Sequence, residues 1–352
     1  MDKILTIVIP TYNMEKYLRK CLDSLIIDDK ELFGKLEVLV VNDGSKDSSS
    51  AIAHEYQDNY PNVFRVIDKE NGNYGSCVNR GLKEANGKYI KILDADDTFN
   101  AENFKAFILF LCDSSADCVL SDMIKINEKG RIIARNSLNL PAKEMLELPQ
   151  FGSENIKMLM MHNVCFKTAI FSNLNYIQTE GISYTDQEWI FLPMSACKEL
   201  IYFPRVVYKY LVGRDGQTID IRVWEKNFWM EIEGLYKMLD VYRNNIEKAI
   251  NIDFLEKRLF VRLRIIYYAY FFIFPTSKNN VIMREFDTYL RIYFPVFYDY
   301  IGEITPTRLF SYKIVKHWRK DYNPERCSIR MPKAFFRIIR NVWIKVKTAL
   351  AL

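Results

Sequence analysis

The sequence predicts an α/β fold, with helices on a Rossmann-like sheet and a mainly α-helical region after it. Short apolar runs rich in Val and Ile have the length of buried strands. They lie at residues 4–9, 36–41, 63–67 and 89–93. Helical patterns fill the intervals, at residues 15–27, 47–59 and 76–85. Strands and helices that alternate at this spacing favour parallel pairing.

The later part of the chain changes character. A helix at 100–113 and a strand at 118–121 continue the pattern, and residues 123–148 indicate a small hairpin and a connecting loop. After about residue 221 the pattern is helical and strongly aromatic. Residues 221–352 carry 24 Lys and Arg against 13 Asp and Glu, whereas residues 1–220 carry 25 against 31. We therefore expect two domains, 1–220 and 221–352, with different roles.

Composition excludes several classes of protein. With 352 residues and 49% hydrophobic content the chain can bury a large core and is not disordered. No run reaches the roughly 18 apolar residues of a membrane span, and residues 265–274 predict a buried helix. The chain starts directly with a strand, so we expect no signal peptide. Seven cysteines without a Cys-x-x-Cys pair favour a reduced, cytoplasmic protein without a disulfide framework or zinc site. The three histidines are too scattered to indicate a metal cluster.

The most informative stretch is the end of the fourth apolar run. The strand at 89–93 is followed by Asp94, Ala95, Asp96 and Asp97. Ligands bind at strand ends in open α/β sheets. Clustered carboxylates repel one another unless a cation or a donor-rich ligand lies between them. A solvated turn in which Asp97 caps the next helix is the alternative.

Two other strand ends offer chemistry for binding a base. Pro10, Thr11, Tyr12 and Asn13 follow the first strand, where the ring can stack on a base and the hydroxyl and amide can bond its edge. Asp43 follows the second strand, where a carboxylate can accept the imide N–H of uracil. Turn formation and helix capping are the alternative for both segments.

A glycine-containing loop precedes the third helix. Asn71, Gly72 and Gly75 lead into it, and Asn79 and Gly81 follow. Glycine allows a ligand to approach the backbone closely, and a helix N-terminus favours phosphate.

Taken in order, these stretches resemble the family-2 glycosyltransferases of the GT-A fold, over roughly residues 1–220. The resemblance rests on Val-Ile-Pro-Thr-Tyr-Asn at 8–13, Val-Asn-Asp-Gly-Ser at 41–45, the Asn-Gly loop, and Gly-Lys-Tyr leading to Leu-Asp-Ala-Asp-Asp at 93–97. It implies a mixed Rossmann-like sheet and a bacterial enzyme of polysaccharide or glycoprotein glycan synthesis. Such an enzyme moves a sugar from a UDP-sugar to a hydroxyl of a glycan, lipid-linked or glycoprotein acceptor.

The resemblance also implies roles for single residues. Thr11, Tyr12 and Asp43 would hold the base, Asp94 would contact the ribose or lie near the metal, and Asp96 would ligate Mn or Mg. The full donor-binding set expected is Pro10, Thr11, Tyr12, Asn13, Asp43, Asn71, Gly72, Asn79, Asp94, Ala95 and Arg214.

One departure from the family pattern concerns arginine. Many relatives have Arg immediately before the asparagine equivalent to Asn79. Val78 stands there in this chain and Arg80 follows instead. A direct contact from Arg80 to the nucleotide is therefore not expected.

The resemblance implies a catalytic base near residue 186. Relatives carry an acidic pair here, and this chain has Thr185 in place of the first acid, followed by Asp186. Asp186 would take the acceptor proton in a single displacement with inversion, while a cation at Asp96 offsets charge on the diphosphate. Glu188 is the fallback base. In the structural alternative, Asp186 caps a helix that begins at Gln187.

Two further segments admit two interpretations each. Residues 208–218 form either a mobile lid, with Arg214 and Lys209 on the donor phosphates, or an ordinary strand and turn. His162 is either structural or part of the acceptor-binding surface.

Residues 333–352 alternate apolar and aromatic side chains with Arg and Lys. This is the pattern of a basic amphipathic helix suited to an anionic membrane, here the inner face of the plasma membrane. The alternative is a helix packed on the protein or on a second subunit of a homo-oligomer. A basic tail without an RNA-binding motif does not predict nucleic-acid binding.

Two other classes of function use similar sequence features. A non-catalytic family member that binds nucleotide sugars or membranes as a scaffold is the alternative to an enzyme. A nucleotidyltransferase is disfavoured, because the segment after the first strand lacks a basic, glycine-rich loop.

Overall fold

The computed structural model describes residues 2–148, 151, 155, 159–214, 216–217, 220–247, 249–305 and 312–324. The expected membrane-binding segment 333–352 lies outside these residues. The chain divides into two compact units. Unit 1 comprises Met1–Asp215 and Asn245–Leu255, and unit 2 comprises Gly216–Asn244 and Glu256–Leu352.

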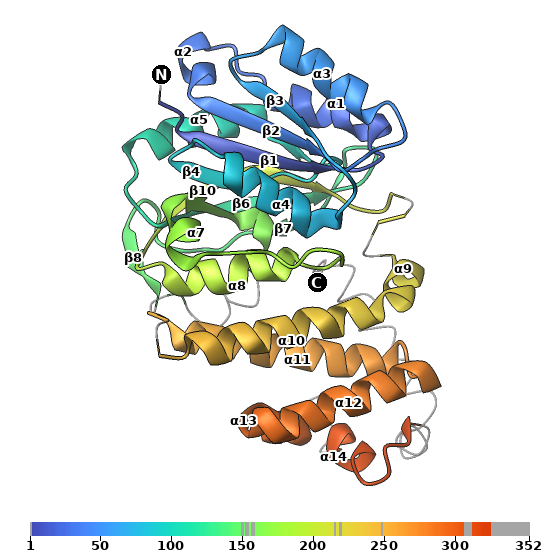
Figure 1. Ribbon diagram of the computed structural model, residues 1–352. Coiled ribbons are helices and arrows are strands. Elements are labelled where there is room, and N and C mark those ends of the chain that lie inside the picture. The colour runs from blue at the N-terminus through green and yellow to red at the C-terminus, as the bar shows by residue number, and fades with distance from the viewer. Residues whose placement is uncertain are drawn as a thin grey trace. The chain divides into compact units, whose positions relative to one another are not determined.

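Unit 1 is built on a mixed sheet with helices on both faces, which confirms the fold class (Figure 1). The strand order is β3-β2-β1-β4-β9-β6-β10-β5, with β7 paired to β6 and β8 to β10. The strands are β1 (Leu5–Thr11), β2 (Leu36–Asn42), β3 (Phe64–Asp68), β4 (Tyr89–Ile92), β5 (Thr98–Phe99), β6 (Cys118–Ile126), β7 (Ile132–Asn136), β8 (Met145–Glu147), β9 (Val164–Lys167) and β10 (Glu199–Leu211).

The first four strands are parallel, and most of their apolar side chains are buried because helices cover both faces. The strand β9 runs antiparallel to both its neighbours, β4 and β6. The strands β5 and β8 run antiparallel to β10, and β7 runs antiparallel to β6. The helical elements of unit 1 are α1 (Glu15–Asp23), α2 (Lys30–Gly34), α3 (Ser49–Asn59), α4 (Asn73–Glu84), α5 (Ala101–Asp113), the 3₁₀ turn η2 (Met161–Asn163), α7 (Ala169–Leu174) and α8 (Asp186–Ala196).

A second stretch of chain, 245–255, completes unit 1. In it, Asn251 reaches the end of α8: its backbone N–H donates to Ser195 O at 3.2 Å, and its Nδ2 donates to Cys197 O at 2.9 Å. These carbonyls are among those a helix leaves without partners at its last turn. The returning chain therefore satisfies the C-terminal end of α8.

Unit 2 consists of helices with an aromatic core. They are α9 (Ile221–Lys226), α10 (Phe228–Asn245), α11 (Ile252–Phe272), α12 (Ser277–Tyr293), α13 (Pro295–Glu303) and α14 (Ile314–Trp318). The last residue of α10 and the first turn of α11, up to Leu255, belong to unit 1. Tyr267 and Tyr270 on α11 are fully buried, which agrees with the buried helix predicted there. The carboxylate of Asp287 accepts from Arg319 at 2.7 Å and from Tyr267 at 2.7 Å, so this buried charge is paired. None of the described helices is both long and apolar enough to cross a bilayer.

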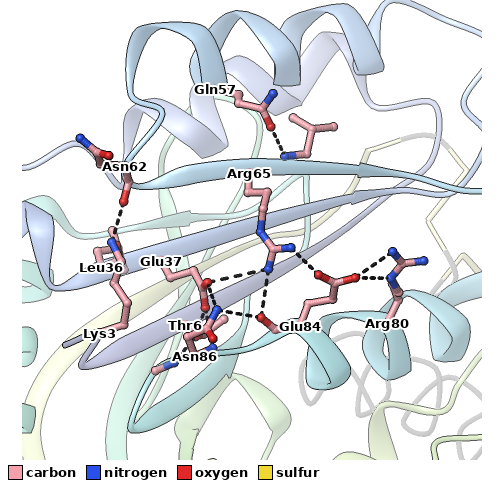
Figure 2. A network of polar contacts seen from close by, with 12 residues as sticks. Lys3, Thr6, Leu36, Glu37, Gln57, Asn62, Arg65, Arg80, Glu84 and Asn86 are labelled. Atoms are coloured by element: carbon pink, nitrogen blue, oxygen red, sulfur yellow. Dashed lines mark hydrogen bonds and ion pairs between the residues drawn. The ribbon is translucent and has the colours of Figure 1, made fainter. Parts of the chain in front are cut away.

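A polar network joins the amino ends of the strands in unit 1 (Figure 2). At its centre, Glu37 on β2 is 7% exposed. Its carboxylate accepts from Thr6 Oγ1 at 2.6 Å, and from Asn86 N and Nδ2 at 2.8 and 2.7 Å. Arg65 Nη2 lies 3.8 Å from Glu37 Oε1, and Arg65 also forms an ion pair with Glu84 at the end of α4. The network ties β1, β2, β3 and α4 together at this edge.

We expect Glu37→Ala to lower the free energy of unfolding by about 3 kcal/mol, because it leaves buried donors without an acceptor. Denaturant unfolding followed by circular dichroism measures this. The matched control is Glu55→Ala, which breaks the Arg19–Glu55 pair with both side chains half exposed, and such pairs contribute little. An equal loss in both variants would contradict the structural role of the network.

Candidate active site

The opposite edge of the sheet, at the carboxyl ends of β1, β2 and β4, gathers the residues singled out in the sequence. Thr11 and Asn42 are register partners, and Asp43 N donates to Thr11 O at 2.8 Å. On the other side of β1, β4 ends at Ile92 and leads to Asp94. Parallel pairing therefore places three sequence segments, near 11, 43 and 94, side by side.

The carboxylate of Asp43 is buried and organises the loop that follows β3. It accepts from Lys69 Nζ at 2.5 Å, from Gly72 N at 2.9 Å and from Asn73 N at 2.9 Å. Asn71 Nδ2 donates to Asp43 O at 3.0 Å. Asp43, Asn71 and Gly72 are thus brought together, and Asp43 satisfies N–H groups at the start of α4.

The residues at the end of β1 and just after it differ in how exposed their side chains are. The ring of Tyr12 is 46% exposed and accessible for stacking. By contrast Thr11 is buried, and its hydroxyl donates to Ile9 O at 3.1 Å. Asn13 has a φ of +54°, and its Oδ1 accepts from Lys46 N at 2.8 Å, so it fixes the turn between this segment and the one after β2.

The three acids after β4 lie in different surroundings. Asp94 accepts from Tyr74 Oη at 3.0 Å, and burial, together with the charge of Asp96, raises the pKa of Asp94 to about 7. Asp97 is 1% exposed and accepts from Tyr208 Oη at 2.7 Å and Leu211 N at 2.6 Å. Burial and the neighbouring acids raise the pKa of Asp97 well above its ordinary value. The negative form of these two carboxyl groups is therefore disfavoured unless a cation or further donors offset its charge.

The alternative in which Asp97 caps the next helix is wrong. The residue that caps α5 is Asn100, whose side chain accepts from Asn103 N at 3.0 Å. Asp97 instead points into the protein, where it holds β10 against the acidic turn.

His162 joins this acidic cluster, which the scattered positions of the histidines did not indicate. It is 5% exposed, its ring stacks on Tyr210 and meets Tyr208 edge-on, and its Nε2 lies 4.0 Å from Asp94 Oδ2. Ligand atoms of Asp94, Asp97 and His162 all lie within 4.8 Å of one another. Burial, and then the charges of two lysines, lower the pKa of His162 to about 3, so the imidazole is neutral.

Arg214 forms an ion pair with Asp96, and both side chains are largely buried. Its guanidinium also lies 5.6 Å from the centre of the Tyr17 ring. Gly213 and Gly216, on either side, have φ values of +92° and +75°, which favour glycine. Lys209 is not part of this arrangement. Successive side chains on a strand point to opposite faces, and Tyr208 is the one that bonds to the acids.

Asp186 is the first residue of α8, and Thr185 is the N-cap. The alternative in which Asp186 itself caps the helix is therefore wrong. Burial raises the pKa of Tyr74 well above its ordinary value, and the charges of Asp94 and Asp186 raise it further. Asp186 is therefore close enough to this part of the site for its charge to act there. Glu188 Oε2 accepts from Thr179 N at 2.8 Å and anchors the preceding loop.

Asn79 holds that same loop rather than the acidic turn. Its Nδ2 donates to Gln178 O at 2.9 Å and to Glu180 Oε1 at 2.8 Å. The backbone of the same loop lies close to Gly75, where a Cβ would lie 1.9 Å from Thr179 O. The close approach that glycine allows here is therefore that of the loop. Both residues of α4 thus position the segment that leads to Asp186.

The family model of glycosyl transferase family 2 matches residues 6–174. These residues form a family-2 glycosyltransferase domain. The domain ends shortly after β9, so it contains the acidic turn and His162. The resemblance seen in the sequence is confirmed.

Relatives of the family-2 domain span several bacteria. An uncharacterized glycosyltransferase of Mycoplasma genitalium is 42% identical over 109 residues, which are 30% of this chain and 36% of that protein. A poly(ribitol-phosphate) beta-glucosyltransferase of Bacillus spizizenii is 27% identical over 289 residues, 80% of this chain and 42% of that protein. The chain thus spans less than half the length of these two relatives.

Among solved structures, residues 1–349 of TarS from S. aureus, in complex with UDP-GlcNAc, match with a TM-score of 0.61 at 18% identity. The match covers 97% of this chain and 92% of that one. At this identity the likeness concerns the fold, and it agrees with a GT-A sheet followed by a helical region.

Proposed function

We propose that the protein is an inverting glycosyltransferase that moves a sugar from a UDP-sugar to a hydroxyl of a glycan, glycolipid or glycoprotein acceptor. The observation that carries the proposal is the acidic turn with Asp94 and Asp96 at the carboxyl ends of the strands of a family-2 domain. The charge of Asp186 also acts on Asp94. The TarS structure that shares the fold contains UDP-GlcNAc, and the Bacillus relative is named as a beta-glucosyltransferase. The first supports a UDP-linked donor, and the second supports transfer of a sugar.

The donor would lie along the carboxyl edge of the first strands. The exposed ring of Tyr12 would stack on the base, and the loop held by Asp43 would shape the pocket beside it. Asn13 belongs to the turn after β1, and Asn71 and Gly72 belong to the loop held by Asp43. Pro10 is the next-to-last residue of β1 and leads into the first of these segments. Asn79 would act indirectly, because it positions the loop at 178–180.

The residues present fit a divalent cation. Three carboxylates lie within one turn, and a buried imidazole beside them has no hydrogen-bond partner on either nitrogen among the described residues. Carboxylate oxygens suit Mg and Mn, and an added nitrogen suits Mn. Asp96, with Asp94 beside it, would hold the ion. When bound, such an ion offsets charge on the departing diphosphate.

Asp186 would remove the proton of the acceptor hydroxyl as its oxygen attacks the sugar. Its place at the start of α8 fixes the carboxylate, and Gln187 Nε2 donates to its Oδ2 at 3.1 Å. Asn251 at the far end and Glu188 near the start restrain the same helix and its loop. The base is therefore held on a rigid element, as proton transfer in a fixed geometry requires.

The test is release of UDP from a panel of UDP-sugars, with and without Mn, together with product analysis for the anomeric configuration. We expect metal-dependent turnover of one donor and inversion. If no donor is turned over and calorimetry detects no donor binding, the alternative of a non-catalytic scaffold replaces this proposal.

We expect Arg214→Ala to raise the KM for the donor about tenfold, which is the loss of one charge-assisted hydrogen bond to phosphate. The matched control is Arg80→Ala, because Arg80 pairs with Glu84 on the exposed side of α4. Steady-state kinetics of UDP release measures both variants. Unchanged kinetics in Arg214→Ala would remove this residue from the donor site.

We propose that the basic C-terminal region serves acceptor, subunit or membrane association in a cytoplasmic protein. Full-length protein should bind vesicles containing anionic lipid, and protein ending at Pro332 should bind them less, because it lacks the basic aromatic segment 333–352. Co-sedimentation measures the difference. Equal binding by both proteins would contradict the membrane role and favour packing on the protein or on a second subunit.

A further inference from the structure

The side chain of Tyr74 reaches from the first turn of α4 to the acidic turn. Its Oη lies 3.0 Å from Asp94 Oδ1 and 3.4 Å from Met161 Sδ. A phenol has one hydrogen to donate, and a carboxylate oxygen is a much stronger acceptor than a thioether sulfur. The hydroxyl of Tyr74 therefore donates to Asp94. The function proposed above gives this tyrosine no part.

The position of Tyr74 is set by the loop that Asp43 holds. Asp43 Oδ2 accepts from Asn73 N at 2.9 Å, and Asn73 Oδ1 accepts in turn from Tyr74 N at 2.9 Å. Asn73 has a φ of +71°, a left-handed conformation in which asparagine is enriched. Ser76 Oγ donates to Asn73 O at 2.7 Å and closes the turn. A series of hydrogen bonds through residues 73 and 74 thus links the carboxylate of Asp43 to that of Asp94.

The contact with Tyr74 engages one oxygen of Asp94 and leaves the other to a ligand. Oδ1 accepts from the phenol, whereas Oδ2 accepts no hydrogen bond from the described residues and lies 4.0 Å from His162 Nε2. The side chain of Asp94 is 27% exposed, so a ligand can reach it. The last torsion of an aspartate is soft, and a hydrogen bond to one oxygen restrains it. Tyr74 therefore decides where the second oxygen points.

The order of the segments along the sheet edge identifies the group that Asp94 meets. The strands β2, β1 and β4 are neighbours, so the segments near 43, 11 and 94 follow one another along the edge. In the proposed function the base lies at Tyr12 and Asp43, and the diphosphate lies at Asp96. The ribose of a nucleoside diphosphate joins these two parts and carries two neighbouring hydroxyls. A carboxylate oxygen accepts hydrogen bonds from such hydroxyls.

We propose that Tyr74 is a positioning residue for the donor ribose: its hydroxyl holds Asp94 so that the second carboxylate oxygen accepts from the ribose hydroxyls. The inference rests on the proposed UDP-sugar donor and adds to it a residue that selects a ribonucleotide. Because the same series of hydrogen bonds begins at Asp43, the base and the ribose are recognised from one loop. Loss of the phenol hydroxyl should weaken nucleotide binding through the ribose alone.

The experiment is calorimetric titration of the full-length protein with UDP and with 2′,3′-dideoxy-UDP, both in the presence of Mn²⁺. We expect the wild-type protein to bind UDP at least about tenfold more tightly, the effect of one hydrogen bond to a charged group. In Tyr74→Phe the affinity for UDP should fall about tenfold, and the affinity for the dideoxy nucleotide should stay the same. Both nucleotides carry the same diphosphate, so a changed hold on a cation would shift both affinities alike.

The matched control is Tyr202→Phe, which removes a hydrogen bond of 2.6 Å between a tyrosine and Asp122 in the same unit, outside the acidic turn. It should leave both affinities unchanged, and thermal melts compare the stability of the two variants. Equal weakening of both nucleotides in Tyr74→Phe, or no weakening, would overturn the role of Tyr74 and leave the proposed donor standing.

The wild-type protein keeps the test decisive if Tyr74→Phe does not fold, because equal affinity for the two nucleotides would overturn the ribose contact. A wild-type protein that binds neither nucleotide would contradict the proposed function and this inference with it. The two failures are therefore distinguishable.

Discussion

Asp186→Asn is expected to lower kcat for sugar transfer by about 10²–10⁴-fold, which is the usual contribution of a general base. The substitution keeps the size of the side chain, and its amide oxygen can still accept from Gln187. The N-cap position of α8 is Thr185, whose side chain makes no capping hydrogen bond, and the substitution leaves that residue unchanged. Donor binding should therefore persist while the chemical step fails.

The measurement pairs steady-state release of UDP with calorimetric titration of the donor. Glu188→Gln is the matched control, since its amide oxygen can still accept from Thr179 N. We expect nearly normal turnover in this variant. Loss of turnover in Glu188→Gln with retention in Asp186→Asn would transfer the role of base to Glu188.

Asp96→Asn is expected to lower metal-dependent transfer by about 10²–10³-fold, which corresponds to several kcal/mol of stabilisation by a cation at the departing diphosphate. The variant also removes the charge that Arg214 faces. An amide retains the shape of the carboxylate, so the turn should keep its structure. We expect a loss of transfer rate of this size because the substitution removes the negative charge that would hold the cation.

The dependence of kcat/KM on Mn²⁺ concentration tests this expectation. Asp28→Asn is the control, because it removes a carboxylate that pairs with Lys105 at the surface. Thermal melts of both variants separate loss of the ion from loss of the fold. Full activity of Asp96→Asn, with an unchanged requirement for Mn²⁺, would assign the ion to other ligands.

The strands β1, β2 and β4 could be predicted from the sequence because parallel strands covered on both faces are largely apolar runs. The strand β3 was also predicted, although Arg65 and Asp68 interrupt its apolar pattern. The strand β6 was predicted to end at Ser121 but continues to Ile126. Asp122 and Lys125 interrupt its apolar pattern, although both are buried. Asp122 accepts from Tyr202 Oη at 2.6 Å, a partner that lies 80 positions further along the chain. Local patterns do not contain such contacts.

The start of α4 was missed for a similar reason. It begins at Asn73, not at Ser76, because the carboxylate of Asp43 accepts from Gly72 N and Asn73 N. The hairpin expected within 123–148 is present as β6 and β7. The turn residues predicted that a hairpin exists, but the sequence did not predict which residues of its two strands pair.

The acidic turn could be located from the sequence because it directly follows an apolar strand. The presence of His162 beside this turn could not be predicted, because His162 precedes the strand β9. Residues before a parallel strand lie at the edge away from the site. Since β9 runs antiparallel to β4, its beginning lies at the same edge as the end of β4. The direction of one short strand thus decides whether this histidine meets the acids.

The return of residues 245–255 to unit 1 limits how this protein can be recombined. One crossover near residue 220 would give a hybrid whose transferase unit receives a foreign segment in place of Asn251, and the carbonyls of Ser195 and Cys197 would lose their donor. Exchange of the helical unit between relatives therefore needs breakpoints on both sides of the returning segment. Evolution by simple fusion of two modules would meet the same obstacle, so the two units are expected to have diversified together.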